Sequence, residues 1–402
     1  MRFEILTNGE NECRKRYRSS TSNGMMVELS TFGAAIQNIA LHHESGWRSI
    51  VLSYKDEEAL CASGSYAGRT LAPNAGRIRG GALDICGRKH SLAPNDGQNQ
   101  LHGGKHNLSF MDWDVEELEE AHDYVKISFT ATQPDGLDGF PGNRRYHVRY
   151  LIEDTNWIRI EYRVETDQPT YVNLSNHTYW NLAGSEWVPA DGWRSALNPD
   201  GEKTDVGHGL HRSMENTRTA NGAGLWQDNE AQMSEIGAGL RQELEIAANN
   251  VVLNDAASLP ADVIPVAGTA FDFRVPVTLQ HMLDSEILRD RTSTEQFQTG
   301  RGFNNAYVLT RADLRRHLRG VRHEEPLKKA CTLRDPVSGH QMTMMTDATA
   351  LVLYSGGFLP TPGSHIALEA QDIPDVSHLL PERMTLTTPE KPFHREIRFK
   401  IS

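Results

Sequence analysis

Four stretches of the chain alternate apolar and polar side chains residue by residue. They are YVKISFTA (124–131), YHVRYLIE (146–153), WIRIEYRVE (157–165) and REIRFKIS (395–402). In an extended strand successive side chains point to opposite faces, so this pattern predicts strands that bury one face and expose the other. Turns rich in Pro, Asp, Asn and Gly separate such runs, and long amphipathic helices are hard to find. The simplest architecture with these features is an antiparallel all-β sandwich.

The length of 402 residues corresponds to two or three average domains, although large all-β sandwiches reach this size as one unit. The stretch from about 186 to 250 is polar, glycine-rich and weakly periodic, apart from a segment at 230–248 that is compatible with a short helix. We interpret residues 1–402 as a single domain with a long polar insertion or lid at about 186–250. The basic stretch at 311–329 has interleaved acids and no aromatic residues, which favours a solvated surface helix or loop.

Charge and cysteine content exclude several classes of function. The formal net charge of −12 opposes binding to nucleic acid or to an anionic membrane surface, and it argues against a polyanionic substrate. The four cysteines lie far apart and form no CxxC pair, so we expect reduced thiols and neither a disulfide framework nor a zinc site. The N-terminus has no signal-peptide pattern and no run is long enough to span a bilayer, which predicts a cytoplasmic protein.

The segment NLSNHTYWNLAG (173–184) encloses His177 among amides and hydroxyls and follows it with Tyr179 and Trp180. A histidine at the end of a strand is often only a satisfied polar residue. The alternative is a sugar site, because the carbon faces of sugars stack on aromatic rings and their hydroxyls bind convergent polar groups. The sequence around His177 favours the second interpretation without excluding the first.

A second segment, HIALEAQDIPD (365–375), places Glu369 within a run of apolar and small residues. Burial there would raise the pKa of the carboxyl group toward neutrality, as a general base needs. The alternative is a strand glutamate that points to solvent on the other face, and the pattern alone leaves the two equal.

Two glycine-ended turns, LAPNAGRIRGG (71–81) and NDGQNQLHGG (95–104), carry Asn74, Arg77 and His102. Loops on a rigid scaffold commonly hold functional residues, but a surface ion pair for Arg77 and a turn role for His102 are the plain alternatives. No GxSxG, GxGxxG, P-loop or HExxH motif is present. The spacing of His208 and His211 suits a metal, yet no third ligand is nearby.

Taken in order, fragments across most of the chain resemble the aldose 1-epimerase (galactose mutarotase) family. They are AGRTLAPNAGRI, NQLHGG, MDWDV, PDGLDGFPGN, PTYVNLSNHTYWNLAG, IPVAGTAFDFRVP, SGHQMTMMTDATALVLYSGGFLP and IALEAQDIPDVSH. The resemblance implies a β-supersandwich, a small-molecule sugar as substrate, and no metal or cofactor. It also implies roles for five residues: His177 as general acid, Glu369 as general base, Arg77 and His102 as contacts of the sugar hydroxyls, and Tyr179 as a pocket residue.

Two positions depart from the family pattern. In GFNNAYVL, Asn304 stands where the family has an aspartate that contacts the sugar, and Asn305 stands for the adjacent histidine. Val352 replaces a glutamine ahead of YSGGF. Asparagine keeps one acceptor oxygen, so the bond to a hydroxyl weakens by about 1 kcal/mol, whereas valine loses it. We therefore expect an aldose other than galactose, an oligosaccharide or a modified sugar.

The expected reaction interconverts α and β anomers of an aldose by acid–base ring opening. It requires a protonated His177, whose pKa should lie at or above the ordinary value, and an ionised Glu369. One alternative is an epimerase of a phosphorylated hexose, although only Arg77 supplies a cation in a matching motif. Another is a sugar-binding or sugar-sensing protein on the same fold, against which the paired acid and base argue.

Overall fold

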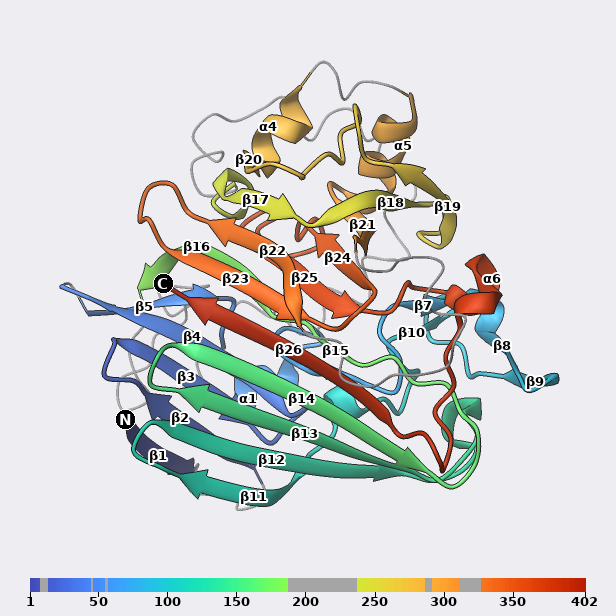
Figure 1. Ribbon diagram of the computed structural model, residues 1–402, viewed down its shortest axis with the longest axis horizontal. Coiled ribbons are helices and arrows are strands. Elements are labelled where there is room, and N and C mark those ends of the chain that lie inside the picture. Colours follow the sequence, from blue (N-terminus) through green and yellow to red (C-terminus); the bar gives the residue numbers. More distant parts are fainter. Residues whose placement is uncertain (8–13, 45, 55–56, 187–236, 286–290, 311–326) are drawn as a thin grey trace.

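A computed structural model describes residues 1–7, 14–44, 46–54, 57–186, 237–285, 291–310 and 327–402 (Figure 1). Within these residues the strands form two large sheets, of eleven and nine strands, and three two-stranded sheets. Buried apolar side chains from both large sheets belong to one shared cluster. The fold is therefore the expected β-supersandwich, in which two sheets pack face to face.

The eleven-stranded sheet is antiparallel throughout and contains elements from both ends of the described chain. In sheet order its strands are β1 (Arg2–Thr7), β2 (Lys15–Ser20), β3 (Met25–Ser30), β4 (Ala35–His43), β5 (Gly46–Val51), β16 (Tyr179–Glu186), β25 (Ile366–Gln371), β24 (Ala350–Tyr354), β21 (Asn304–Leu309), β18 (Ala248–Asn254) and β19 (Pro260–Pro265).

The nine-stranded sheet is also antiparallel. In sheet order its strands are β11 (Asp114–Glu120), β12 (Tyr124–Gln133), β13 (Arg144–Glu153), β14 (Trp157–Thr166), β26 (Phe393–Ile401), β23 (Gln341–Thr346), β22 (Lys328–Arg334), β17 (Glu243–Ile246) and β20 (Val277–Thr278). The small sheets pair β6 (Thr70–Leu71) with β15 (Ser175–Asn176), β7 (Arg77–Ile78) with β10 (Gln100–Leu101), and β8 (Ala82–Ile85) with β9 (Arg88–Ser91).

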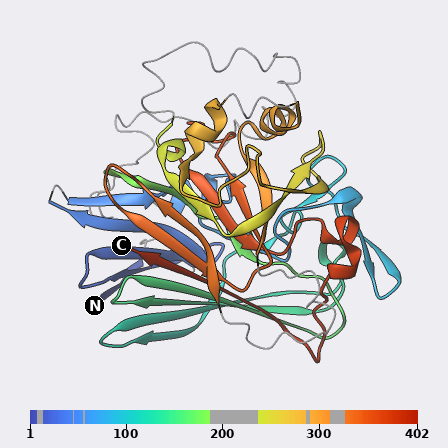
Figure 2. The same cartoon turned by 45° about the horizontal axis from the view of Figure 1, so that its top comes forward.

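Helices among the described residues are short. They are α1 (Glu57–Ala62), α4 (Leu279–Asp284), α5 (Arg291–Gly300) and α6 (Val376–Leu379), with 3-10 turns at η1 (Arg79–Gly81), η2 (Leu108–Phe110), η3 (Leu137–Gly139), η4 (Gly239–Arg241) and η7 (Pro381–Arg383). Figure 2 shows α4 and α5 beyond the strands β17 and β18, outside the layered sheets. No helix of the described part is long and apolar enough to cross a membrane, and the cytoplasmic location remains a prediction.

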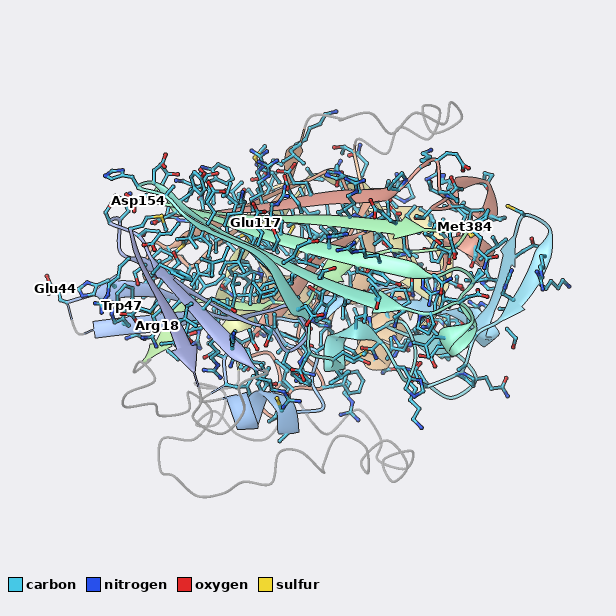
Figure 3. All side chains as sticks on the ribbon, turned by 90° about the horizontal axis from the view of Figure 1, so that it is seen from below. Arg18, Glu44, Trp47, Glu117, Asp154 and Met384 are labelled. Atoms are coloured by element: carbon cyan, nitrogen blue, oxygen red, sulfur yellow. The ribbon has the colours of Figure 1, made fainter. Side chains whose placement is uncertain are left out.

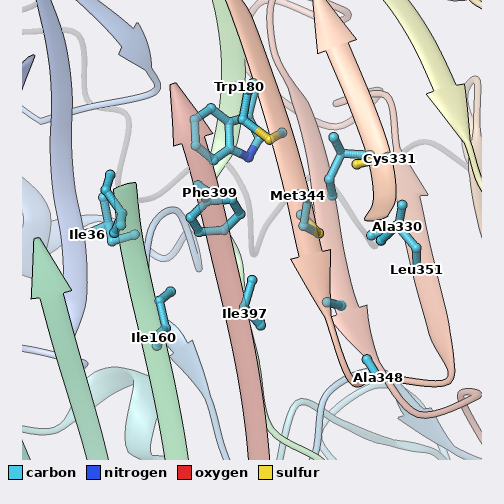
Figure 4. Packing of buried hydrophobic residues seen from close by; sticks show 14 of the residues in the cluster. Ile36, Ile160, Trp180, Ala330, Cys331, Met344, Ala348, Leu351, Ile397 and Phe399 are labelled. Carbon is cyan, nitrogen blue, oxygen red and sulfur yellow. The ribbon is translucent and has the colours of Figure 1, made fainter. Parts of the chain in front are cut away.

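All four alternating stretches of the sequence are strands, namely β12, β13, β14 and β26. Their apolar residues point into the sandwich: Tyr146, Val148 and Tyr150 of β13 are 0% exposed, whereas Arg145 and Arg149 on the opposite face are exposed. The chain ends in β26, which pairs with β14 on one side and β23 on the other. Figure 4 shows Phe399 of β26 beneath the indole of Trp180, with ring centroids 5.0 Å apart. The C-terminal strand therefore lies in the middle of the core.

Strand β25 differs from these, because every one of its six residues is buried. One face packs into the sandwich core, to which Leu368 and Ala370 belong. The other face carries Glu369 and is covered by the long loops between β5 and β11 and by the segment after β25. A continuous apolar run with one carboxylate is the sequence signature of a strand that is covered on both faces.

The insertion expected at about 186–250 falls mostly outside the described residues. Its last part is described and belongs to the sheets, since β17 pairs with β22, and β18 lies between β21 and β19. A helix at 230–248 is wrong for the described portion, which contains only the 3-10 turn η4 before β17. Most of the basic stretch at 311–329, and both His208 and His211, also lie outside the described residues.

The molecule is elongated along its strands when it is seen from below. Figure 3 shows the hairpin of β4 and β5, with Glu44 and Trp47, at one end, and the light-blue hairpin of β8 and β9 beyond Met384 at the other. Three cysteines are described: Cys61 on α1, whose Sγ accepts from Arg14 Nη1 at 2.8 Å, Cys86 after β8 and the buried Cys331 on β22.

Candidate active site

His177 and Glu369 lie side by side although they are far apart in the sequence. His177 Nε2 is 3.4 Å from Glu369 Oε1, and the two side chains are only 7% and 6% exposed. The strand register accounts for this, because β16 and β25 are antiparallel with Tyr179 opposite Ala367. Counting two residues back from Tyr179 and two residues forward from Ala367 places position 177 opposite position 369. The structure thus brings together the two residues that the sequence singled out as acid and base.

The backbone around His177 is held by the segment that precedes β6. The His177 N–H donates to the carbonyl of Arg69 (3.0 Å), and the Gly68 N–H donates to the carbonyl of His177 (2.9 Å). Gly68 has a φ of +71°, and a Cβ there would lie 1.9 Å from the carbonyl oxygen of Ile36. Only glycine fits at this position, so the placement of His177 depends on it.

The amides near His177 serve the backbone and not a ligand. Asn176 Nδ2 donates to the carbonyl of Gly68 (2.9 Å), and its Oδ1 accepts from the Thr178 N–H (3.0 Å). The amide oxygen of Asn181 accepts from the N–H of Ala183 (3.3 Å). The expectation that these side chains converge on sugar hydroxyls is therefore wrong for Asn176 and Asn181, because a short irregular segment between two strands must satisfy its own backbone groups.

Burial shifts the pKa values of the two facing groups in opposite directions. Desolvation lowers the pKa of His177 to about 4 and raises the pKa of Glu369 to about 8, while the charge of Arg77 opposes the shift at Glu369. The raised pKa of Glu369 matches the expectation. The expected pKa of His177, at or above the ordinary value, is wrong, because full burial penalises the imidazolium and the free pair carries its proton on Glu369.

His102 reaches the same place from the loop after β10. The Gly76 N–H donates to His102 Nδ1 (3.1 Å), so the ring proton resides on Nε2, which can donate to a ligand. Its ring centroid is 5.7 Å from that of His177. Desolvation, followed by the charges of His177 and Arg77, lowers the pKa of His102 well below its usual value. His102 is therefore a neutral hydrogen-bond donor beside the acid–base pair.

Arg77 forms the ion pair that was one of its two candidate roles, and it also lies near the acid–base pair. Its Nε donates to Asp96 Oδ2 at 2.7 Å, so it does form an ion pair. Its charge also acts on Glu369 and on His102, so the guanidinium lies near both. The ion pair fixes the side chain, and a fixed cation beside Glu369 stabilises the carboxylate form that a base needs.

Aromatic rings surround His177 on two sides. Tyr179 stacks on its imidazole with ring centroids 4.7 Å apart, and Tyr354 of β24 follows at 6.0 Å from Tyr179. Tyr66 lies 4.6 Å from the ring of His102 and 6.3 Å from that of His177. Sequence reasoning missed Tyr66 and Tyr354. Tyr354 is the first residue of the quoted stretch YSGGF. The only sequence signal for it was the two-residue period of a strand, which places Tyr354 on the same sheet face as Val352.

Asn304 and Val352 share the sheet face of Glu369. Val352 is directly opposite Glu369, and Asn304 is opposite Tyr354, two strands away from β25. Two strand spacings are roughly 10 Å, so Asn304 lies about that far from Glu369 on the same face of the sheet. Asn305 points to the other face, where its Nδ2 donates to the carbonyl of Val252 and to Gln296 Oε1, both at 3.0 Å. Of the two asparagines, only Asn304 is placed to meet a ligand.

Arg395 of β26 is a further residue that sequence reasoning missed. It donates to Asn173 Oδ1 (2.8 Å), to the carbonyl of Leu174 (2.7 Å) and to Asp372 Oδ1 (2.7 Å). These contacts join the segment before His177 to the segment after Glu369. The two-residue period of β26 puts position 395 on the buried face of Ile397 and Phe399, a signal that the sequence analysis did not use, and the pairing opposite buried Tyr162 agrees with it.

The described residues contain no group of three His, Cys, Asp or Glu side chains placed to hold a metal ion. What the site holds is a buried carboxyl group, two imidazoles, a paired guanidinium and several aromatic rings on one face of a β-supersandwich. The carboxyl group of Glu369 and the imidazole of His177 can accept one proton and donate another at the same small region of a bound molecule. The fold and these groups define the class of galactose mutarotase-like β-supersandwich proteins.

Comparisons with known proteins agree with that class. The sequence profile of the family described as aldose 1-epimerase matches residues 15–208. An aldose 1-epimerase of Escherichia coli (strain K12) is 26% identical over 88% of this chain and 84% of its own length. A maltose epimerase of Levilactobacillus brevis is 23% identical over 90% and 87%, respectively. The chain is thus similar to members of the aldose 1-epimerase family over most of its length.

Solved structures show the same fold. The crystal structure of galactose 1-epimerase from Lactobacillus acidophilus superposes with a TM-score of 0.73 at 22% sequence identity, covering 100% of this chain and 98% of the other. The likeness therefore extends over the whole described architecture, beyond the part that the family profile matches.

Proposed function

We propose that the protein is an aldose 1-epimerase, an isomerase that interconverts the α and β anomers of a free sugar. The observation that carries this proposal is the 3.4 Å approach of His177 Nε2 and Glu369 Oε1, two buried groups that can each gain or lose a proton. Similarity to the aldose 1-epimerase family profile and to its relatives supports it, and the names of the relatives extend to galactose and maltose.

The proposed reaction moves two protons and breaks one bond. Glu369, as carboxylate, takes the proton of the anomeric hydroxyl while His177, as imidazolium, gives a proton to the ring oxygen. The bond between C1 and the ring oxygen breaks and C1 becomes an aldehyde. After rotation about the C1–C2 bond, the ring oxygen returns its proton to His177 and adds to the other face of C1, while O1 regains the proton from Glu369. Each group ends as it began.

The remaining residues position the sugar in this proposal. Arg77 and His102 donate to ring hydroxyls, and Arg77 also favours ionised Glu369 once water is displaced. Tyr179 offers a ring face next to His177, and Asn304 contacts the side of the sugar remote from C1. Glu369 becomes a carboxylate when it passes its proton to His177. The neutral pair and the ionised pair therefore hold the same number of protons.

Polarimetry of freshly dissolved pure anomers tests the proposal. The wild-type protein should accelerate the approach to the equilibrium rotation of at least one aldose. His177→Asn and Glu369→Gln should each lower kcat by on the order of 10²- to 10⁴-fold, because each removes one proton-transfer group. Val337→Ala, on a 93% exposed turn residue, is the matched control. Near wild-type rates in both variants would refute the assignment of the pair.

A sugar-binding protein without turnover would give a different result. It would bind aldoses in calorimetry while leaving mutarotation at the uncatalysed rate. The acid–base pair argues against this outcome, since a binding protein gains nothing from burying a carboxyl group with a strongly raised pKa.

A further inference from the structure

Aromatic rings continue outward from the proposed catalytic pair to the surface. His177 stacks on Tyr179, the Tyr179 ring lies 6.0 Å from Tyr354, and the Tyr354 ring lies 6.4 Å from Phe358 at an interplanar angle of 25°. The exposed fraction rises along this series, from 7% at Tyr179 to 42% at Phe358. Phe358 is one of the few large apolar side chains of the described residues with that much exposure. An exposed ring that continues a buried site needs an explanation.

Arg301 adds a hydrogen-bonding group to this outer ring. Its guanidinium carbon lies 4.7 Å from the centroid of Phe358. The side chain is exposed, and no hydrogen bond or ion pair with the rest of the described chain occupies its donors. Stacking on the ring limits the directions of the guanidinium, so its free N–H groups are held beside the aromatic surface. An aromatic face beside open donors is the combination that carbohydrate recognition uses.

The support beneath Phe358 and Arg301 is rigid. A Cβ on Gly357 would lie 2.1 Å from the carbonyl oxygen of Arg301, so the turns at 301 and 357 are in direct backbone contact. The Phe358 N–H donates to Tyr354 Oη at 2.6 Å, which ties the turn to β24. A preorganised surface of this kind loses little entropy when a ligand binds.

From these contacts we propose that Phe358 and Arg301 form a subsite for a second sugar ring, so that the protein takes reducing disaccharides as well as monosaccharides. The inference rests on the proposed function, which places the reducing ring at Glu369 and His177. In a pyranose, C4 lies across the ring from C1, so a second ring linked through O4 points away from the catalytic pair. The direction from Glu369 past Tyr354 leads to Phe358, because Tyr354 is the diagonal neighbour of Glu369 on β24.

Substitution of the outer ring should separate the two kinds of substrate. We expect Phe358→Ala to lower kcat/KM for the anomers of maltose by roughly three- to tenfold, as expected for loss of one stacking contact. For glucose the change should stay within about twofold, because Phe358 does not reach the first ring. Arg301→Gln should act in the same direction, and Val337→Ala should leave both sugars unaffected. Polarimetry of both sugars gives the values.

Three outcomes would overturn the subsite. They are equal losses for maltose and glucose in Phe358→Ala, no catalysis of maltose by a wild-type protein that converts glucose, and competition by glucose 6-phosphate that Arg301→Gln relieves. The last result would assign Arg301 to a phosphate. If neither sugar is converted, the proposed function fails, and calorimetry of maltose against glucose with the wild type and Phe358→Ala tests the subsite by itself. Selective loss of maltose affinity in Phe358→Ala supports it, and equal affinities refute it.

Discussion

The acid–base pair carries a single proton over a wide pH range. Burial holds the pKa of His177 at about 4 and that of Glu369 at about 8, so between these values the pair contains a neutral imidazole and a protonated carboxyl group. The form proposed for catalysis differs from this only by transfer of that proton over 3.4 Å. Two groups this close titrate as a unit, so the relevant quantity is the proton count of the pair.

A plot of kcat/KM against pH should therefore be bell-shaped, with widely separated acid and alkaline limbs. Activity falls on the alkaline side as the pair loses its only proton near pH 8, and on the acid side as it gains a second near pH 4. A pH series of kcat/KM by polarimetry, with the uncatalysed rate subtracted at each pH, measures both limbs. An acid limb near the ordinary histidine value of 6.5 would mean that burial does not control His177.

Burial of Glu369 also predicts a cost in stability. Its folded pKa is about 8 against an ordinary value of 4.5, so the folded state binds more protons than the unfolded state between these values. Stability contributed by this group is thus full below about pH 4.5 and is lost as pH rises toward 8. Glu369→Gln removes the titration and should raise Tm by an amount that grows from pH 5 to about 8.5. Thermal unfolding followed by circular dichroism measures it, and a Tm difference that shrinks with pH would contradict the sign.

The residues of the site were unequally visible in the sequence. Glu369 interrupts an apolar run and His177 precedes two aromatic rings, so the amino-acid pattern by itself marks both as unusual. Tyr66 and Arg301 lie in loops, where no periodicity reveals direction. Nor does the sequence give the sign of the pKa shift at His177, because neighbouring amides suggest a polar shell, whereas the fold turns these amides to the backbone.

At the scale of elements, the two halves of the site are joined through the C-terminal strand. Arg395 of β26 contacts the segment that leads to His177 and, through Asp372, the segment that follows Glu369. Asn173 adds a direct link, since its Oδ1 accepts from the Asp372 N–H at 2.8 Å. Arg395 thus acts as a positioning residue, which is buried and does not itself contact the pair.

Replacing Arg395 should damage both fold and rate. Arg395→Met leaves the buried Asn173 and the carboxylate of Asp372 without their cation, which should cost on the order of 3–5 kcal/mol of unfolding free energy. Arg395→Lys keeps the charge but not the three-way hydrogen bonding, so we expect a smaller loss of stability with a clear fall in kcat at little changed KM. Urea unfolding and polarimetry on both variants measure these effects. If the Arg395→Lys protein folds and keeps the wild-type kcat, Arg395 is not a positioning residue.

Long regular strands were predictable, and short ones were not. β12, β13, β14 and β26 show clean alternation because one face meets the core and the other meets solvent. β6, β7, β10 and β15 have two residues each, which is too short for any period, yet they hold the loops of Arg77, His102 and His177 in place. β17 and the start of β18 fall within the stretch that we interpret as an insertion, because their flanking residues are polar and glycine-rich.

At the scale of the whole molecule, strands from distant parts of the chain alternate within each sheet. The eleven-stranded sheet places β16 between β5 and β25, and the nine-stranded sheet places β26 between β14 and β23. Each large sheet therefore contains chain from both sides of the stretch at 187–236. Order within a sheet follows from long-range pairing, which local sequence patterns do not encode.

This interleaving supports our interpretation of residues 1–402 as one domain. Unfolding in denaturant should give coincident midpoints for tryptophan fluorescence and far-ultraviolet circular dichroism, because neither sheet persists without the other part of the chain. Addition of a bound sugar should shift both probes together. Separate midpoints, with one probe unaffected by sugar, would show two domains instead.

The central claim is that His177 and Glu369 act as one catalytic unit, and a double-mutant cycle tests it most directly. Polarimetric kcat is measured for the wild type, His177→Asn, Glu369→Gln and the combined variant. For a single unit, the combined variant should be no more than about tenfold slower than the slower single variant, because either loss already breaks the proton exchange. Losses that multiply in the combined variant, or near wild-type kcat in either single variant, would contradict the account.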